Sequence, residues 1–242
     1  ITNLQLTYDN YGRIEHKSDI GDYLYEANSG RLSTAGTYSL AYDSKGQAID
    51  ITSAAGVNNQ PAWYSFNKMR SIEGPASEEV RFYYDASGVL TLKVETLNQR
   101  DSYYLGNQTR IITPVGVEER FTIQAMHGAV AEVAVTSPLA PEQPGEQRLS
   151  FLHTDFHGTP TAIVANGNVL QQRYDPFGRR TDTPGAFHVG VNAESVTVGF
   201  TGHEAETAYD LINMRARYFH PLLATFVQAD TVIPDPRRGI DW

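Results

Sequence analysis

Apolar and polar residues alternate along most of this chain in short runs, and that pattern is typical of β-strands rather than helices. The run from Phe121 to Met126, for example, alternates residue by residue before a His-Gly pair ends it. Units that contain a tyrosine follow one another at steps of 17 to 22 residues, about the length of one hairpin. A single hairpin cannot bury its own apolar face, so successive hairpins are expected to stack side by side. The pattern therefore predicts an all-β fold of antiparallel hairpin repeats, with units at Tyr8, Tyr25, Tyr42, Tyr64, Tyr84 and Tyr104.

A turn motif, Tyr-Asp-x-x-Gly, ends several of these strands. In this motif the tyrosine ring packs on the neighbouring strand, the aspartate accepts backbone N–H bonds, and the glycine takes the positive φ that reverses the chain. With 14 tyrosines and 20 glycines one copy arises readily by chance, but four copies with the same spacing favour a repeat. The motif residues are Tyr8, Asp9 and Gly12; Tyr42, Asp43 and Gly46; Tyr84, Asp85 and Gly88; and Tyr174, Asp175, Pro176, Gly178 and Arg179.

The stretch 199–236 has the densest and least repetitive signals in the chain. A Thr-Gly-His turn at Gly202 and His203 precedes an acidic segment that permits one or two helical turns as far as Tyr209. Apolar alternation then predicts a strand, which His220-Pro221 ends, and a second short apolar run follows. We interpret the stretch as a terminal plug rather than another hairpin. Its apolar residues expected to be buried against the repeats are Leu211, Met214, Tyr218, Phe226 and Val227.

One segment divides the chain into two candidate parts. Residues 136–147 contain three prolines and a glycine among polar residues, which is typical of a linker or a surface loop. We therefore expect degenerate repeats over residues 1–135 and a closing region over residues 148–242.

Composition and charge narrow the class of function. A net charge of −9 without a dense basic cluster argues against nucleic-acid binding. The chain has no cysteine, which excludes disulfides and thiolate metal sites, and no apolar run approaches the roughly 20 residues of a membrane-spanning helix. It begins at Ile1 without an initiator methionine or a signal-peptide pattern, so we take it as an excised or processed fragment.

Motifs for catalysis and metal binding are weak. His153 and His157 flank Asp155 at a spacing of four, but on a strand or turn that spacing does not present two imidazoles to one metal as it does on a helix. A hydrogen-bonded turn is favoured there. The chain has no Gly-x-Ser-x-Gly, P-loop, Gly-x-Gly-x-x-Gly or His-Glu-x-x-His motif, and we expect no cofactor and no metal.

Six short motifs in the second half of the chain occur in an order that resembles the closing core of the RHS/YD-repeat proteins. The resemblance covers essentially the whole chain, with degenerate YD repeats over residues 1–135 and the RHS repeat-associated core from about residue 148 to the end. The motifs are Phe151-Leu-His-Thr-Asp155-x-x-Gly158-Thr-Pro160, Asn166-Gly167, Tyr174-Asp-Pro-Phe-Gly-Arg179, Phe200-Thr-Gly-His203-Glu204, Leu211-Ile212-x-Met214-Arg215-Ala216-Arg217-Tyr218 and Phe226-x-x-Ala229-Asp230.

The resemblance implies both a fold and a function. Members of this family build a long β-strip that spirals into a hollow shell, as in bacterial Rhs toxins, toxin-complex C subunits and, more distantly, teneurins. In bacterial members the shell encloses a toxic C-terminal domain, and the core forms an inward plug in which Gly202, His203, Arg217 and Tyr218 are motif residues. The implied partners are the protein's own C-terminal toxin or cargo domain, the rest of the shell, and a secretion or toxin-complex component. The implied location is secreted or delivered to a cell surface.

Asp230 is the one catalytic residue that the resemblance implies. Many bacterial members cut themselves after the core by aspartyl chemistry, which needs two carboxylates that share a proton. Asp230 matches the first aspartate, and the second has no match before Trp242, because Asp235-Pro-Arg-Arg-Gly239 has an extra arginine and lies too close. The chain also departs from the family at Ala224-Thr225-Phe226, where Gly-Arg-Phe is usual, and at Asp230-Thr231, where Asp-Pro is usual.

Three hypotheses about function follow. The first is a structural shell fragment that encapsulates or presents a C-terminal toxin domain. The second is a cis-acting aspartyl autoprotease that releases this domain, with Asp230 as one carboxylate. The third is a teneurin-like adhesion or glycan-binding module that uses exposed aromatic side chains.

Overall fold

The computed structural model describes residues 3–75, 77–126, 128–139, 144–181 and 196–230. Two compact units divide the chain: unit 1 comprises residues 1–79 and 216–242, and unit 2 comprises residues 80–215. Among the described residues, no helix is long and apolar enough to cross a membrane.

The described chain is almost entirely β-structure, with two single-turn 3-10 helices, η2 (Phe200–Gly202) and η3 (Thr207–Tyr209). Unit 1 contains β1 (Leu6–Tyr8), β2 (Ile14–Lys17), β3 (Gly21–Tyr25), β4 (Leu32–Ala35), β5 (Tyr38–Tyr42), β6 (Ala48–Ser53), β7 (Asn58–Trp63), β8 (Met69–Glu73), β20 (Tyr218–His220) and β21 (Thr225–Phe226). Unit 2 contains β9 (Glu79–Tyr84), β10 (Leu90–Glu95), β11 (Arg100–Leu105), β12 (Gln108–Thr113), β13 (Gly116–Ala125), β14 (Gly128–Pro138), β15 (Glu146–Thr154), β16 (Pro160–Ala165), β17 (Asn168–Gln171), β18 (Glu204–Glu206) and β19 (Leu211–Asn213).

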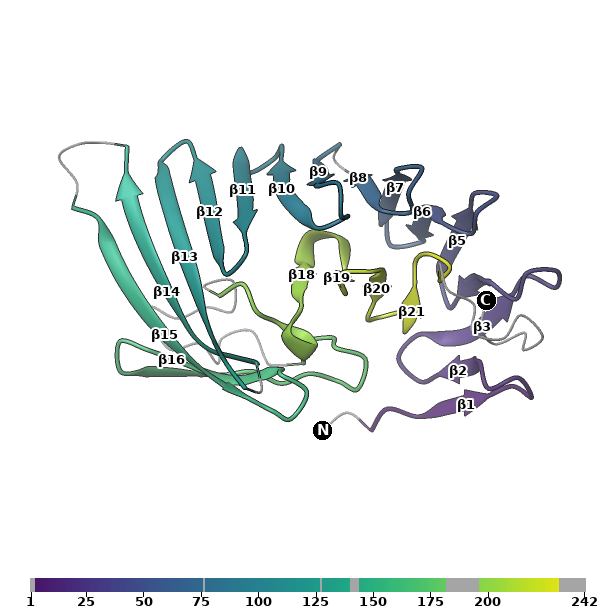
Figure 1. Cartoon of the computed structure of the whole chain (residues 1–242). Coiled ribbons are helices and arrows are strands. Elements are labelled where there is room, and N and C mark those ends of the chain that lie inside the picture. Colours follow the sequence, from purple (N-terminus) through teal and green to yellow (C-terminus); the bar gives the residue numbers. More distant parts are fainter. Residues whose placement is uncertain (1–2, 76, 127, 140–143, 182–195, 231–242) are drawn as a thin grey trace. The chain divides into compact units, whose positions relative to one another are not determined.

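Strands that follow one another in the chain pair antiparallel within each unit (Figure 1). Unit 2 continues the pattern from β9 to β17. The remaining four strands form the short hairpins β18–β19 in unit 2 and β20–β21 in unit 1. The predicted all-β class with antiparallel hairpins is confirmed.

The Tyr-Asp-x-x-Gly motif forms one turn geometry throughout. Asp9 Oδ1 accepts hydrogen bonds from the backbone N–H groups of Tyr11 and Arg13, both at 2.9 Å. The N–H of Gly12, whose φ is +80°, donates to the Asp9 carbonyl at 3.0 Å. These bonds close the turn locally, because the aspartate satisfies two donors that the reversal leaves without strand partners. The same bonds recur at Asp43, Asp85, Asp155 and Asp175.

The tyrosines connect each hairpin to the one before it. Tyr25 lies under the Arg13 guanidinium, 4.2 Å from its ring centroid, and its hydroxyl donates to the Ile14 carbonyl at 2.8 Å. The next unit repeats both contacts, at 5.8 Å and 2.9 Å, with Arg31, Tyr42 and Leu32. These two units are therefore each fixed to the preceding one by a cation–π contact and a hydrogen bond.

The expected linker at residues 136–147 includes the ends of two paired strands. Thr136 lies opposite Glu146 and Val135 lies opposite Gln147, so β14 and β15 are in register on both sides of the prolines. The two compact units meet in sequence elsewhere, at residues 79–80 and 215–216. The functional division into repeats and closing core stays a prediction.

The acidic segment before Tyr209 differs from its predicted helical turns. Residues Glu204–Glu206 form strand β18, and only η3 is helical. Residues two apart on a strand lie on the same face, so Glu204 and Glu206 both point toward one partner, which a helix would not allow. Of the five apolar residues expected to be buried in the last stretch, Leu211, Tyr218 and Val227 are buried, and Met214 and Phe226 are half-buried.

Candidate functional site

The candidate site is the contact between residues 196–230, here called the closing segment, and the strands of each unit. In unit 1 the contact is made largely by backbone groups. The N–H of Ala48 donates to the Val227 carbonyl at 2.8 Å, and the N–H of Ala229 donates to the Gly46 carbonyl at 3.1 Å. Gln228 Nε2 donates to the Asn67 carbonyl at 2.9 Å. Strand-like hydrogen bonding thus holds the end of the closing segment on the sheet.

Buried polar side chains add to this contact in unit 1. Lys17 is fully buried, and its Nζ donates to the Asp19 carboxylate at 2.7 Å and to the Leu222 carbonyl at 3.1 Å. Tyr23 Oη donates to the Leu223 carbonyl at 3.2 Å. Such groups are tolerated in a core because each has a partner.

His220 is the buried imidazole of unit 1. Its Nδ1 accepts from the backbone N–H of Leu223 at 3.4 Å, and its ring contacts Tyr38 edge to face at a centroid distance of 6.1 Å. Burial lowers the pKa of His220 to about 4, so the ring is neutral at physiological pH. An uncharged ring suits this apolar site.

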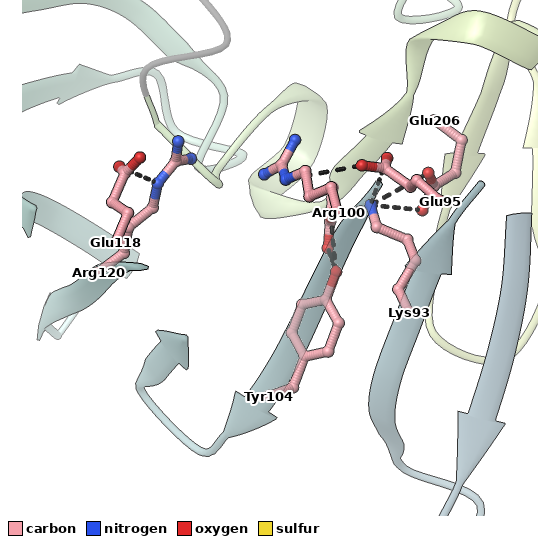
Figure 2. Close-up of polar contacts among 8 residues, drawn as sticks. Lys93, Glu95, Arg100, Tyr104, Glu118, Arg120 and Glu206 are labelled. Carbon is pink, nitrogen blue, oxygen red and sulfur yellow. Dashed lines mark hydrogen bonds and ion pairs between the residues drawn. The ribbon is translucent and has the colours of Figure 1, made fainter. Parts of the chain in front are cut away.

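In unit 2 the closing segment is held by a buried cluster of charges, which we call the lysine cluster. It consists of Lys93, Glu95, Arg100, Tyr104, Glu204 and Glu206. Figure 2 shows Lys93 of β10 reaching the carboxylates, with Tyr104 and Arg100 of β11 beside it. Lys93 Nζ lies 2.6 Å from Glu204 Oε1 and 3.2 Å from Glu206 Oε2.

Contacts of Tyr104, Glu95 and Arg100 complete the lysine cluster. Tyr104 Oη donates to the Glu204 carboxylate at 2.8 Å. Glu95 Oε1 is 3.9 Å from Lys93 Nζ, and Glu95 Oε2 is 3.6 Å from Arg100 Nε. Only 4% of the Lys93 and Glu206 side chains is exposed, so solvent screens this pair weakly.

The two glutamates of β18 titrate differently. Burial opposes the ionisation of Glu204, but the Lys93 ammonium outweighs it and keeps the pKa of Glu204 below its ordinary value. Burial raises the pKa of Glu206 to about 7, and the charge of Glu204 acts in the same direction. Burial lowers the pKa of Lys93, yet the two carboxylates hold it well above its usual range. Within the lysine cluster, Glu206 is therefore the group that gains or loses a proton near neutral pH.

Another buried carboxylate, that of Glu132 in β14, contacts the start of the closing segment. Glu132 Oε2 accepts from the Thr197 N–H at 3.1 Å, and burial raises the pKa of Glu132. Apolar packing surrounds this contact, in a cluster of Ala129, Leu152, Ile163, Ala165, Leu170 and Val196. Residue Val196 thus fixes the entry of the closing segment onto the sheet of unit 2.

The Phe200-Thr-Gly-His203 turn contacts two of the Asp-x-x-Gly turns. A Cβ at Gly178 would lie 2.5 Å from the Phe200 ring, which therefore fits only against a glycine. The Thr201 N–H donates to Thr159 Oγ1 at 3.0 Å. His203 Nδ1 lies 3.0 Å from Thr201 Oγ1, inside the turn.

Asp230 forms an ion pair with another motif residue. Its Oδ2 lies 3.0 Å from Arg217 Nη2, and the Arg217 guanidinium lies 3.7 Å from the Phe226 ring centroid. The Arg217 side chain, just before β20, thereby contacts both Phe226 of β21 and Asp230. The position expected for catalysis therefore holds a carboxylate paired with a cation. The sequence offers no second aspartate for it, and the Asp235 segment that was rejected as a match lies outside the described residues.

A groove of about 630 Å³ in unit 1 borders Ala229, the residue before Asp230. Tyr11, Tyr25 and Arg31 line it together with Arg13. The Arg13 guanidinium is already paired with Asp9 at 2.7 Å and stacked on Tyr25, so it serves the contact between hairpins.

Sequence reasoning missed the lysine cluster. Lys93 contacts glutamates 111 and 113 residues away, so no local pattern joins them. One signal was available: a lysine at a core-facing strand position predicts buried carboxylate partners. Two acidic residues spaced two apart, as Glu204 and Glu206 are, supply them on one face of a strand.

No family model matches this chain, and no curated protein matches it in sequence.

Solved structures, by contrast, share its fold. The chain is similar to the crystal structure of TcdB2-TccC3-TEV, with a TM-score of 0.60 and 14% identity over 94% of this chain and 14% of that chain. It is also similar to those of TcdB2-TccC3-Cdc42 and TcdB2-TccC3, with TM-scores of 0.58 and 0.57. Both are 14% identical to it and are matched over 94% of this chain and 16% of theirs. The chain thus spans about a sixth of those chains and has the fold of part of these toxin-complex structures.

Proposed function

We propose that this chain is the C-terminal wall and closing core of an RHS-type shell that encloses or presents a toxin or cargo domain. The observation that carries the proposal is the way in which one segment is fixed to the sheet of each unit by buried contacts. Lys17 and Val227 contribute in unit 1, and Lys93 and Glu132 contribute in unit 2. A catalytic role would not need these anchors, whereas a wall that must stay closed does.

Two further observations support a structural role. The turn motifs make their hydrogen bonds within the wall, and the likeness to the toxin-complex structures supports a shell fold of this kind. Secretion and the identity of the cargo are parts of the proposal that come from the resemblance.

Limited proteolysis of the full-length gene product tests the shell. A cargo inside a closed wall is expected to resist a protease that cuts the free cargo, and Leu223→Ala is expected to remove this protection. Leu223 is fully buried, so its truncation opens the contact between the closing segment and unit 1. Leu24→Ala, at an exposed strand position of the same unit, is the matched control. Equal cutting of the cargo in the wild type and as a free domain would refute the shell.

Asp230→Asn in the same product separates the shell from the autoprotease. Because Asp230 is paired with Arg217, we expect the variant to give the same fragments as the wild type. A C-terminal fragment released only by the wild type would instead show that Asp230 acts as a catalytic carboxylate, since asparagine keeps the shape but cannot share a proton.

A further inference from the structure

The lysine cluster has more negative than positive groups. Lys93 and Glu95 from β10 and Glu204 from its own strand β18 act directly on Glu206. Tyr104 from β11 donates to Glu204, and Arg100 from β11 pairs with Glu95 and acts on Glu204. Three carboxylates therefore face two cations, and Tyr104 is a neutral hydrogen-bond donor. One added proton makes the cluster neutral.

The position of the cluster links its charge to the closing segment. Glu204 and Glu206 belong to the closing segment, and Lys93 and Tyr104 belong to the wall, so the contact between the two contains the excess charge. Glu206 is 4% exposed, and an uncompensated charge at such a site is costly.

We propose that the lysine cluster is a pH-sensitive latch that holds β18 on β10 and β11 at mildly acidic pH and weakens as the pH rises to neutrality. At mildly acidic pH Glu206 is protonated, and Lys93 and Glu204 form a single ion pair to which Tyr104 donates. Above neutrality Glu206 loses its proton and two buried carboxylates compete for Lys93. This proposal rests on the proposed function, in which β18 is part of a closing core.

The direction of the pH response follows from linkage. The pKa of Glu206 is about 7 in the folded chain and is ordinary once the strand is released. The closed state then binds more protons than the open state between these values, so the latch weakens as pH rises from about 4.5 to 7 and stays weak above that. Glu204 has the opposite pH dependence because its pKa is lowered. Its ion pair stabilises the closed state at and above the ordinary pKa of a glutamate, and this contribution is lost as the pH falls below that value.

Hydrogen–deuterium exchange of the full-length product tests the latch. After correction for intrinsic exchange, opening of the peptide around β18 is expected to increase about tenfold between pH 5.5 and 7. Glu206→Gln, which keeps the shape and stays neutral, is expected to abolish this increase. Glu119→Gln is the matched control, because it changes a glutamate of unit 2 that is paired with Arg110 rather than with the closing segment, and it should leave the response of β18 unchanged. A pH response that persists in Glu206→Gln overturns the proposal.

A second measurement covers the case in which Glu206→Gln does not fold. Carbon-13 NMR of glutamate-labelled wild-type protein should then show one carboxyl that titrates near neutral pH, and absence of any such resonance overturns the latch. Failure of the shell is distinguishable: a cargo that is protected while β18 exchange is independent of pH refutes the latch alone. A pH response with an unprotected cargo refutes the shell alone.

Discussion

The closing segment is held in two chemically different ways in the two units. In unit 1 its anchors are backbone carbonyls, as at Val227 and Leu222, and a neutral buried imidazole, His220. In unit 2 its anchors are carboxylates, Glu204 and Glu206, on a buried lysine. Both arrangements satisfy buried polar groups, and each includes a buried lysine paired with a carboxylate. Only in unit 2 do the carboxylates belong to the closing segment, so that opposite charges face each other across the contact.

This difference gives the two contacts opposite responses to pH. His220 has a depressed pKa, so its contribution to stability is lost as pH falls through its ordinary range near 6.5 towards 4. Glu206 has a raised pKa, so its contribution is lost as pH rises towards 7. A pH titration of each unit therefore separates the two modes of attachment.

The largest effect is expected from removing the cation of unit 2. Lys93→Met leaves two carboxylates in a buried site without compensation, and we expect the free energy of unfolding to fall by about 3–5 kcal/mol. Denaturant unfolding checks this value. Arg110→Met is the control, because the pair with Glu119 is about half exposed and should contribute under about 1 kcal/mol. Equal losses in both variants would show that the lysine cluster is not a buried network.

A smaller effect is expected from acid in unit 1. Lowering the pH from 7 to 5 should reduce the free energy of opening of the contact around His220 by about 2 kcal/mol. The reason is that the ring binds a proton in this range once it is exposed to solvent, but not while it is buried. Hydrogen exchange of peptides from residues 216–230 measures this opening.

His220→Asn should remove that dependence, since the amide oxygen can accept from Leu223 and does not titrate. His157→Asn, in the Asp155 turn of unit 2, is the control that should keep it. The interpretation of His220 is wrong if its variant retains the acid response of the wild type.

The smallest effect is a gain in stability at Ala224. This residue has φ +52°, a left-handed conformation that alanine disfavours, and it stands where the RHS resemblance has glycine. Ala224→Gly is expected to raise the free energy of unfolding by about 0.5–1 kcal/mol. Ala229→Gly, where φ is not positive, should lower it. A loss of stability in thermal melts of Ala224→Gly would contradict this account of the turn.

The repeated wall was predictable from sequence because its determinants are local. Asp9 makes its turn with Tyr11 and Arg13, so five consecutive residues contain the whole interaction. Residues Leu211 and Val227 were also predicted to be buried, since strand alternation alone indicates their face.

The closing contact was not predictable in the same way. Glu204 and Glu206 read as helix-permissive residues, because acidic side chains are common in helices and their partner Lys93 is more than 100 residues away. Tertiary pairing with the lysine decided in favour of a strand. The role of Asp230 stays a prediction, since its partner in the family pattern has no match in this chain.

The stacking of an arginine on the next tyrosine in the first hairpins is a contact that duplication of a whole unit preserves. A copied unit brings both an arginine for the tyrosine after it and a tyrosine for the arginine before it, as Arg13 with Tyr25 and Arg31 with Tyr42 show. Insertion of a whole unit therefore leaves no unmatched group at either junction, whereas insertion of half a unit separates an arginine from its ring. In the stretch from Tyr8 to Tyr42, therefore, only insertions of whole units are expected to keep these contacts.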